Sequence, residues 1–122
     1  MQITLKKSDI VTSHTVNYKN VYVEYGQCYM NACHFVCANP DWTLVHAVIV
    51  SPIGGFEMGH AWVEGTVDGV EIAIEVFFQL AVKKESHRQA TKIVYEKRYT
   101  FEEMMKLVKE TINYGPWDKT IQ

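Results

Sequence analysis

One cysteine and one histidine of this chain have the neighbours expected of a nucleophile and its base. Cys28 follows Gly26 and Gln27 and opens an apolar run, so we expect it in the first turn of a helix. A helix N-terminus favours a thiolate through its unpaired backbone N–H groups and its dipole. His60 follows later in the chain, in a segment of strand-forming residues. A thiolate and an imidazole held together can carry out nucleophilic attack on a carbonyl carbon.

A predicted hairpin supplies a carboxylate for this histidine. Asp68-Gly69 stands between two strand-forming runs, 59–67 and 70–78, and is a strong signal for a two-residue turn. In that register His60 and Glu75 lie diagonally on the same face of adjacent strands, about 7 Å apart. Their side chains can bridge this spacing. We therefore predict that Glu75 orients the imidazole.

Other carboxylates and histidines fit these roles less well. Glu64 shares the face of His60 but lies four residues along the same strand, about 13 Å away. Glu57 precedes the strand run and Glu71 lies near the turn. His46 is the rival base, but no carboxylate lies at hairpin distance from it, so we expect it at the edge of the core. We expect the remaining histidines to lie on the surface or to pack in helices without a partner: His14, His34 and His87.

The two other cysteines are expected to pack in the core. Cys33 and Cys37 lie on a helix face about 140° to 180° away from Cys28, and apolar packing is common for such cysteines. Together with His34 they are also a short set of zinc-type ligands. Adjacent helix positions diverge by about 100°, however, and the chain offers no second pair of ligands. We therefore expect neither a metal ion nor a cofactor.

Size and charge exclude several classes of function. A chain of 122 residues fits one domain, residues 1–122, whose folding buries about 65% of the unfolded surface. A net charge of −2 gives no general attraction to nucleic acid or anionic lipid, and no apolar run approaches the ~20 residues of a membrane span. Three closely spaced cysteines suit a reducing compartment. We expect a cytoplasmic protein that binds neither nucleic acid nor membrane.

The elements that must position these side chains define an α+β fold. An apolar helix carrying Cys28 is expected to be buried nearly all round and to pack against an antiparallel sheet that carries His60 and Glu75. Asn39-Pro40 ends that helix, and a capping box of Thr100 and Glu103 begins a second one. In chain order we predict a strand-like or extended segment at 16–25, a helix at 28–38, strands at 43–50, 59–67 and 70–78, a loop or short helix at 83–90, a strand at 91–99, and a final helix that ends before Gly115-Pro116.

Two motifs resemble transglutaminase-like proteins within the papain-like cysteine hydrolase superfamily. Tyr25-Gly26-Gln27-Cys28-Tyr29 resembles the Tyr-Gly-Gln-Cys-Trp active-site motif of transglutaminases. His60-Ala61-Trp62-Val63-Glu64 resembles the His-Ala-Trp-Asn-Glu segment of bacterial transglutaminase-like proteins. The resemblance covers roughly residues 25–78 and implies a papain-like catalytic core.

Carried over to this chain, the resemblance implies Cys28 as nucleophile, His60 as general base and then acid, and Glu75 as the orienting acid. The family usually has an aspartate, often in Asp-Pro-Thr, at the third position. The resemblance also implies the backbone N–H of Cys28 as one oxyanion donor. Gln27 and Tyr22 are the candidates for the second donor.

The activity implied is that of a cysteine-dependent hydrolase or acyl transferase acting on an amide bond of a protein or peptide-like substrate. Water would resolve the acyl-enzyme in a peptidase, amidase or deamidase, and an amine would do so in a transglutaminase. The sequence leaves these open. The alternative is a catalytically silent module of the same fold that binds a peptide or a partner protein through exposed aromatic residues such as Trp42, Trp117 and several tyrosines.

Overall fold

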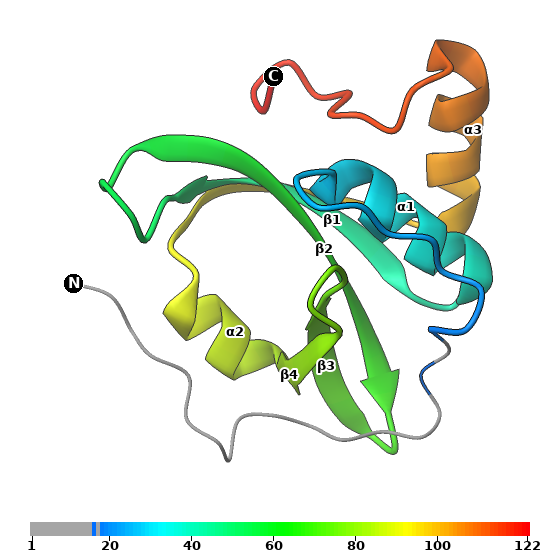
Figure 1. The fold of residues 1–122 in the computed structure, drawn as a ribbon, viewed down its shortest axis with the longest axis horizontal. Coiled ribbons are helices and arrows are strands. Elements are labelled where there is room, and N and C mark those ends of the chain that lie inside the picture. Colours follow the sequence, from blue (N-terminus) through cyan, green and yellow to red (C-terminus); the bar gives the residue numbers. More distant parts are fainter. Residues whose placement is uncertain (1–15, 17) are drawn as a thin grey trace.

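A curved antiparallel sheet forms the centre of the molecule (Figure 1). The computed structural model describes residue 16 and residues 18–122, which form five strands and three helices, and the predicted α+β class is confirmed. In chain order the elements are α1 (Cys28–Ala38), β1 (Thr43–Val50), β2 (Glu57–Val67), β3 (Val70–Glu75), β4 (Leu80–Lys83), α2 (Lys84–Ala90), β5 (Ile93–Tyr99) and α3 (Phe101–Thr111). The strands are arranged as β4-β3-β2-β1-β5, so the strand that carries His60 is central.

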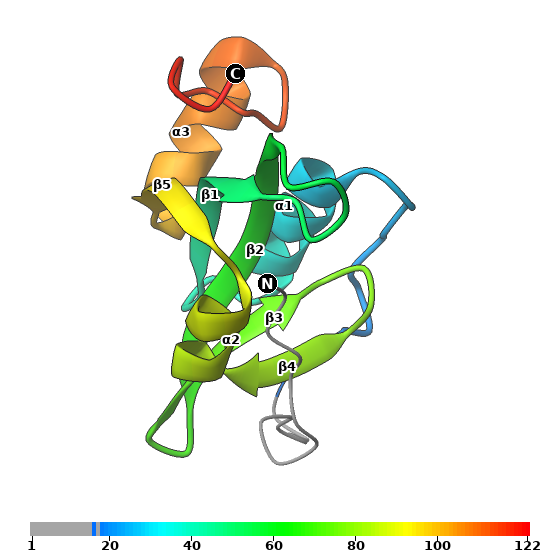
Figure 2. The same ribbon diagram turned by 90° about the vertical axis from the view of Figure 1, so that its left-hand side faces the viewer.

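Helices lie on both faces of the sheet (Figures 1 and 2). α1 and α3 pack on one face, where Leu44 and Val63 belong to the main core. α2 lies against the other face, where Val45 and Trp62 belong to a smaller cluster. Successive strand residues point to opposite faces, so the same strands supply both clusters.

The helix that carries Cys28 has the predicted bounds. Five of its residues are buried: Asn31, Ala32, Cys33, Phe35 and Val36. Cys33 is in the core as predicted, and burial raises the pKa of its thiol to about 12. The same prediction was wrong for Cys37. It lies in the last turn of α1 with its sulfur 4.0 Å from that of Met105 of α3, but this one-sided contact does not bury it and it remains exposed.

The hairpin between β2 and β3 has the predicted register. Val67 pairs with Val70 across the turn, and Asp68 and Gly69 have φ angles of 52° and 80°. Positive φ at both central residues is the signature of a type I′ turn, whose twist matches that of the flanking strands.

The third strand is shorter than predicted. β3 ends at Glu75, and a turn follows in which the Gln79 N–H donates to the Val76 carbonyl at 3.1 Å. This turn leads into β4, a short strand that the sequence analysis did not predict. Apolar residues after Glu75 look like a continued strand in the sequence, but the chain reverses there.

Outside the hairpin, most predicted elements are confirmed. The strand at 43–50 has its predicted bounds, the polar segment after β4 is the short helix α2, and Thr100 and Glu103 form the predicted capping box. The segment at 16–25 forms no strand within its described residues, of which 19, 20 and 25 lie in turns and the others have no regular secondary structure. Apolar side chains of this segment, including Tyr18 and Val21, pack against the main core without pairing as a strand. Within the described part of the chain, no helix has the length and apolar character needed to cross a bilayer.

Candidate active site

The His60 ring lies between a thiol and a carboxylate. Its Nε2 atom is 2.7 Å from Glu75 Oε1, and the side chain also forms a hydrogen bond with Cys28. Because Nε2 faces the carboxylate, Nδ1 is the ring nitrogen left for the thiol. The structure therefore brings the three predicted site residues together, in the order needed to pass a proton between a nucleophile and a base.

Cys28 is the first residue of α1, and the turn before it is held by Asn31. Asn31 is 1% exposed, and its side chain accepts a hydrogen bond from the Glu24 N–H at 2.9 Å and donates one to the Glu24 carbonyl at 2.8 Å. The N-cap residue Gln27 makes no side-chain cap hydrogen bond. The helix N-terminus is therefore open beside Cys28. Asn31 was not among the predicted site residues, although an asparagine inside an apolar helical run was a usable signal.

The close approach of α1 to β2 depends on Gly59, the neighbour of His60. A Cβ at position 59 would lie 2.4 Å from the hydroxyl oxygen of Tyr29, which follows Cys28 in α1. Real Cβ atoms essentially never approach another heavy atom so closely. The absence of a side chain at position 59 therefore lets the cysteine and the histidine meet.

The charges of the site complement a thiolate. Burial disfavours the imidazolium form of His60, but hydrogen bonds to Cys28 and Glu75 and the charges of both outweigh burial and raise the His60 pKa to about 10. Burial also disfavours the ionised form of Glu75. Hydrogen bonds from His60 and His87 outweigh it and lower the Glu75 pKa to about 2. At neutral pH the site thus contains an imidazolium and a carboxylate.

His87 is a further residue of the site, which its sequence context did not indicate. It was expected on the surface or in a helix without a partner, yet it is 3% exposed and its Nε2 lies 2.7 Å from Glu75 Oε2. His87 comes from α2, a polar segment in which a histidine is normally solvated. The turn after β3 brings that helix back over the face of Glu75, and the local sequence carries no signal for this return.

The rival base, His46, lies deeper than the predicted edge of the core. Its ring is fully buried and stacks against the rings of Tyr29, Tyr99 and Trp117. Neither ring nitrogen has a hydrogen-bond partner in the described part of the chain, and burial lowers its pKa to about 4. His46 is therefore isolated from the site.

Two further predictions about histidines can be compared with the structure. His34 does have partners, because its ring nitrogens lie 2.8 Å from the Tyr22 carbonyl oxygen and 3.1 Å from the Tyr114 hydroxyl. The middle of α1 meets the segment before it and the C-terminal segment there, a contact that the sequence could not predict. His14 lies outside the described residues.

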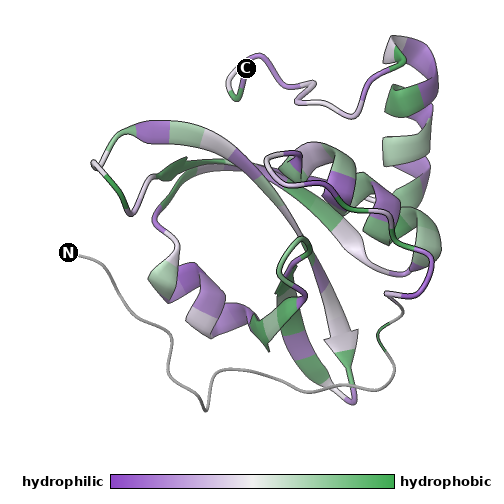
Figure 3. Ribbon diagram, in the orientation of Figure 1, coloured by the Kyte–Doolittle hydropathy of each residue, from purple (hydrophilic) through white to green (hydrophobic). Residues whose placement is uncertain are grey.

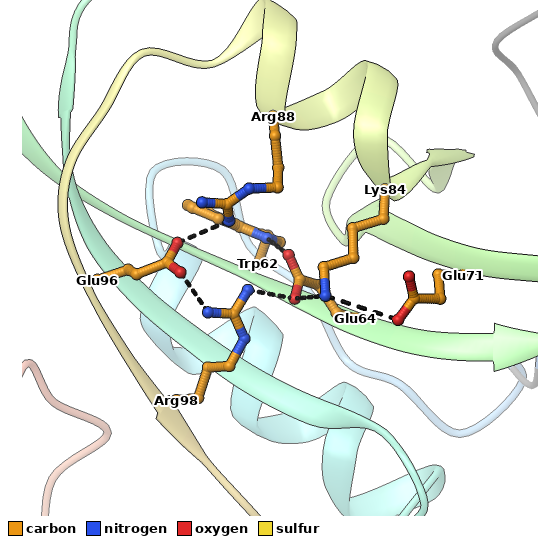
Figure 4. A network of polar contacts seen from close by, with 7 residues as sticks. All are labelled: Trp62, Glu64, Glu71, Lys84, Arg88, Glu96 and Arg98. Atoms are coloured by element: carbon orange, nitrogen blue, oxygen red, sulfur yellow. Dashed lines mark hydrogen bonds and ion pairs between the residues drawn. The ribbon is translucent and has the colours of Figure 1, made fainter.

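Glu64 belongs to a separate network of charges, as Figure 4 shows. It accepts hydrogen bonds from the Trp62 indole at 3.1 Å and from Arg98 at 2.7 Å. Its carboxylate is 5% exposed and makes no contact with His60 in the structure described here. The expectation that Glu64 cannot orient His60 agrees with this arrangement.

Tyr22 and Gln27 are the candidates for the second oxyanion donor. Neither is among the described residues that line the cavity beside Cys28. The Tyr22 hydroxyl donates to the Glu24 carboxylate instead. Gln27 is exposed at the N-cap of α1. The backbone N–H of Cys28 is the donor that remains from the resemblance.

His60 and Glu75 line two separate hollows of the surface. The hollow beside Cys28 has a volume of about 490 Å³, and Tyr25, Phe77 and Phe78 belong to its wall. The second has a volume of about 330 Å³. Its described lining also includes Ser51, Pro52, Thr91 and Lys92.

Of the aromatic residues expected to be exposed, the two tryptophans pack in or against the core, whereas tyrosines are found at the surface. Trp42 is 9% exposed and its ring packs against Phe35, while Trp117 packs against His46. Tyr25 and Phe78 are 84% and 72% exposed. A tryptophan in a loop segment is expected to be exposed to solvent, but both of these pack against core residues.

Comparisons with protein-family models, with curated proteins and with solved structures found no match. Within the described residues, no group of three or more His, Cys, Asp or Glu side chains is arranged to hold a metal ion.

Proposed function

We propose that this chain is a cysteine-dependent hydrolase or acyl transferase acting on an amide bond, with Cys28, His60 and Glu75 as its triad in a papain-like, transglutaminase-like core. The observation that carries the proposal is the position of the His60 ring. It is hydrogen-bonded to Cys28, and its Nε2 is 2.7 Å from Glu75 Oε1. Such a ring can donate a proton while a carboxylate holds its orientation.

In the proposed reaction the Cys28 sulfur forms a bond with the carbonyl carbon of the substrate. The carbon–nitrogen bond then breaks, and the His60 imidazolium gives its proton to the leaving amine. Water or a second amine attacks the resulting thioester, and His60 takes the proton of that nucleophile as the thiolate leaves. Glu75 keeps the imidazole in the required tautomer and orientation. The backbone N–H of Cys28, at the open N-terminus of α1, stabilises the oxyanion.

The wall of the larger hollow favours a substrate with a bulky apolar group. Tyr25 contacts Phe77 and Phe77 contacts Phe78 edge to face, with ring centroids 5.7 Å and 5.1 Å apart. Exposed aromatic rings in a hollow are typical contacts for apolar ligand groups. Apart from tyrosine hydroxyls, the ionisable side chains among the described lining residues are those of the triad. A peptide or protein with an apolar residue beside the amide therefore fits best.

The first test is acylation with the p-nitrophenyl ester of N-acetylphenylalanine, followed by mass analysis of peptides. We expect the acyl group on Cys28 and no acylation of the Cys28→Ala variant. Cys37→Ala is the matched control, because Cys37 is an exposed thiol outside the site, and it should be acylated at Cys28 like the wild type. Labelling that survives Cys28→Ala contradicts the proposal.

The exposed aromatic residues also support a second candidate, a catalytically silent module that binds a peptide or a partner protein. Tyr25 and Phe78 present their rings to solvent beside the hollow, as contact residues of an interface do. A stoichiometric complex that is unaffected by Cys28→Ser, without turnover of any amide, would favour this candidate over the enzyme.

A further inference from the structure

Two imidazoles bind Glu75, one at each oxygen of its carboxylate. Oε1 is 2.7 Å from His60 Nε2, and Oε2 is 2.7 Å from His87 Nε2. The terminal torsion of a glutamate is broad, so a single hydrogen bond leaves the carboxylate free to rock. A second hydrogen bond on the other oxygen fixes the plane of the carboxylate and with it the direction of Oε1.

The surroundings of His87 indicate a polar role in addition to packing. The ring is 3% exposed, and its Nδ1 is buried without a hydrogen-bond partner in the described part of the chain. A buried polar atom without a partner costs about 1–3 kcal/mol, so an apolar side chain would fill this space at lower cost. The contact that requires a histidine is the one to Glu75. Since a carboxylate only accepts hydrogen bonds, Nε2 must carry the proton.

Trp62 connects the two imidazoles. The His87 ring centroid is 4.9 Å from that of Trp62, and the His60 ring centroid is 5.9 Å from it on the same face of β2. The Trp62 indole donates to Glu64, which fixes the indole in turn. Both histidines therefore rest on one anchored aromatic ring.

Charged contacts hold the helix that carries His87 against the sheet (Figure 4). Lys84 Nζ lies 3.7 Å from Glu64 Oε1 and 3.8 Å from Glu71 Oε1, and Arg88 donates to Glu96 at 2.8 Å. α2 has seven residues and is largely hydrophilic, as Figure 3 shows. So short a helix is marginal alone. Its contacts at both ends place His87 over Glu75.

We propose that His87 is a positioning residue of this site, which holds the Glu75 carboxylate in the orientation that bonds His60. The proposal rests on the proposed function, since the bond that His87 preserves is the one that orients the base. The hydrogen bond from His87 is also one of the contacts that lower the Glu75 pKa.

The experiment compares His87→Leu with His87→Gln. Glutamine can present an amide N–H near the position of the histidine Nε2, whereas leucine fills the space without a donor. With the aminomethylcoumarin amide of N-acetylphenylalanine as substrate, kcat should fall at least tenfold in His87→Leu, with KM nearly unchanged. In His87→Gln, kcat should stay within about threefold of the wild type. Gln89→Leu, at an exposed position of the same helix, is the matched control and should change neither constant.

A second readout does not depend on activity. The carboxyl carbon of Glu75, followed by NMR during titration, should show a higher pKa in His87→Leu and a pKa close to that of the wild type in His87→Gln. If His87→Leu does not fold, His87→Asn replaces it, because its shorter amide cannot reach Oε2. An unchanged Glu75 titration overturns the proposal, as does a shifted titration with unchanged kcat. If the wild type shows neither turnover nor acylation, the proposed function fails, and the titration alone decides whether His87 holds Glu75.

Discussion

Tyr29 in α1 and Gly59 in β2 approach each other so closely that a Cβ at position 59 would lie 2.4 Å from the tyrosine hydroxyl oxygen. Each residue is the chain neighbour of a proposed catalytic residue, Cys28 or His60. We therefore expect the contact between these two neighbours to influence the distance between nucleophile and base.

Gly59→Ala should slow acylation of Cys28 at least tenfold with the p-nitrophenyl ester of N-acetylphenylalanine. The new methyl group must push the Tyr29 side chain away, and the first turn of α1 moves with it. Far-ultraviolet circular dichroism should remain that of the wild type. The control is Gly59→Ala combined with Tyr29→Phe, which removes the clashing oxygen and should restore most of the rate. A double variant as slow as the single one would show that this contact does not set the geometry.

Glu75→Gln and Glu64→Gln should affect different properties. Glu75→Gln removes the charge that orients His60, so turnover of the amide substrate should fall at least ~tenfold, or about 1.4 kcal/mol of transition-state stabilisation. Glu64→Gln should leave turnover within a few-fold of the wild type. Because Glu64 is buried and binds Arg98, that substitution should instead lower the free energy of unfolding by about 1–3 kcal/mol. Thermal and kinetic assays of both variants check this, and the reverse ranking in turnover would remove Glu75 from the triad.

The alkaline limb of the pH profile should reflect His60. Its pKa is raised to about 10, so the imidazolium that protonates the leaving amine persists through neutral pH and is lost near pH 10. Glu75 helps to raise that pKa, so the midpoint should move to lower pH in Glu75→Gln. The same interactions stabilise the fold fully below about pH 6.5, the ordinary pKa of histidine, and this contribution disappears as pH rises towards 10. An alkaline midpoint that does not move in Glu75→Gln contradicts the assignment.

His46 should make the fold sensitive to acid. Its pKa is lowered from 6.5 to about 4 by burial, so the unfolded chain takes up a proton at higher pH than the folded one. The free energy of unfolding is therefore highest, with respect to His46, above pH 6.5. It decreases as pH falls from 6.5 towards 4. At about 1.36 kcal/mol for each pH unit between the two pKa values, the loss is on the order of 3 kcal/mol. Urea unfolding at several pH values should show this loss, and His46→Leu should reduce it.

The predicted site came from features that are local in the sequence. Asp68-Gly69 determines the register of its own hairpin, and that register relates His60 to Glu75 without knowledge of the rest of the fold. Cys28 was identified in the same way, since the glycine before it and the apolar run after it mark the start of a helix. Short-range rules were sufficient wherever the chemistry lies within one element or one hairpin.

The residues that were missed depend on contacts between distant elements. His87 reaches Glu75 because the chain reverses after β3, and Asn31 acts on the backbone of a preceding turn. Trp42 is drawn into the core against Phe35. None of these contacts produces a repeating pattern in the sequence, because each depends on how separate elements pack together.

The most direct test of the central claim is to quench the enzyme with acid during turnover of the aminomethylcoumarin amide and to measure the mass of the intact protein. We predict a population that carries one N-acetylphenylalanyl group, located on Cys28 by peptide mapping and absent from Cys28→Ala. Turnover without an acyl group on Cys28 would contradict the account, and so would tight binding of the amide without turnover by the wild type.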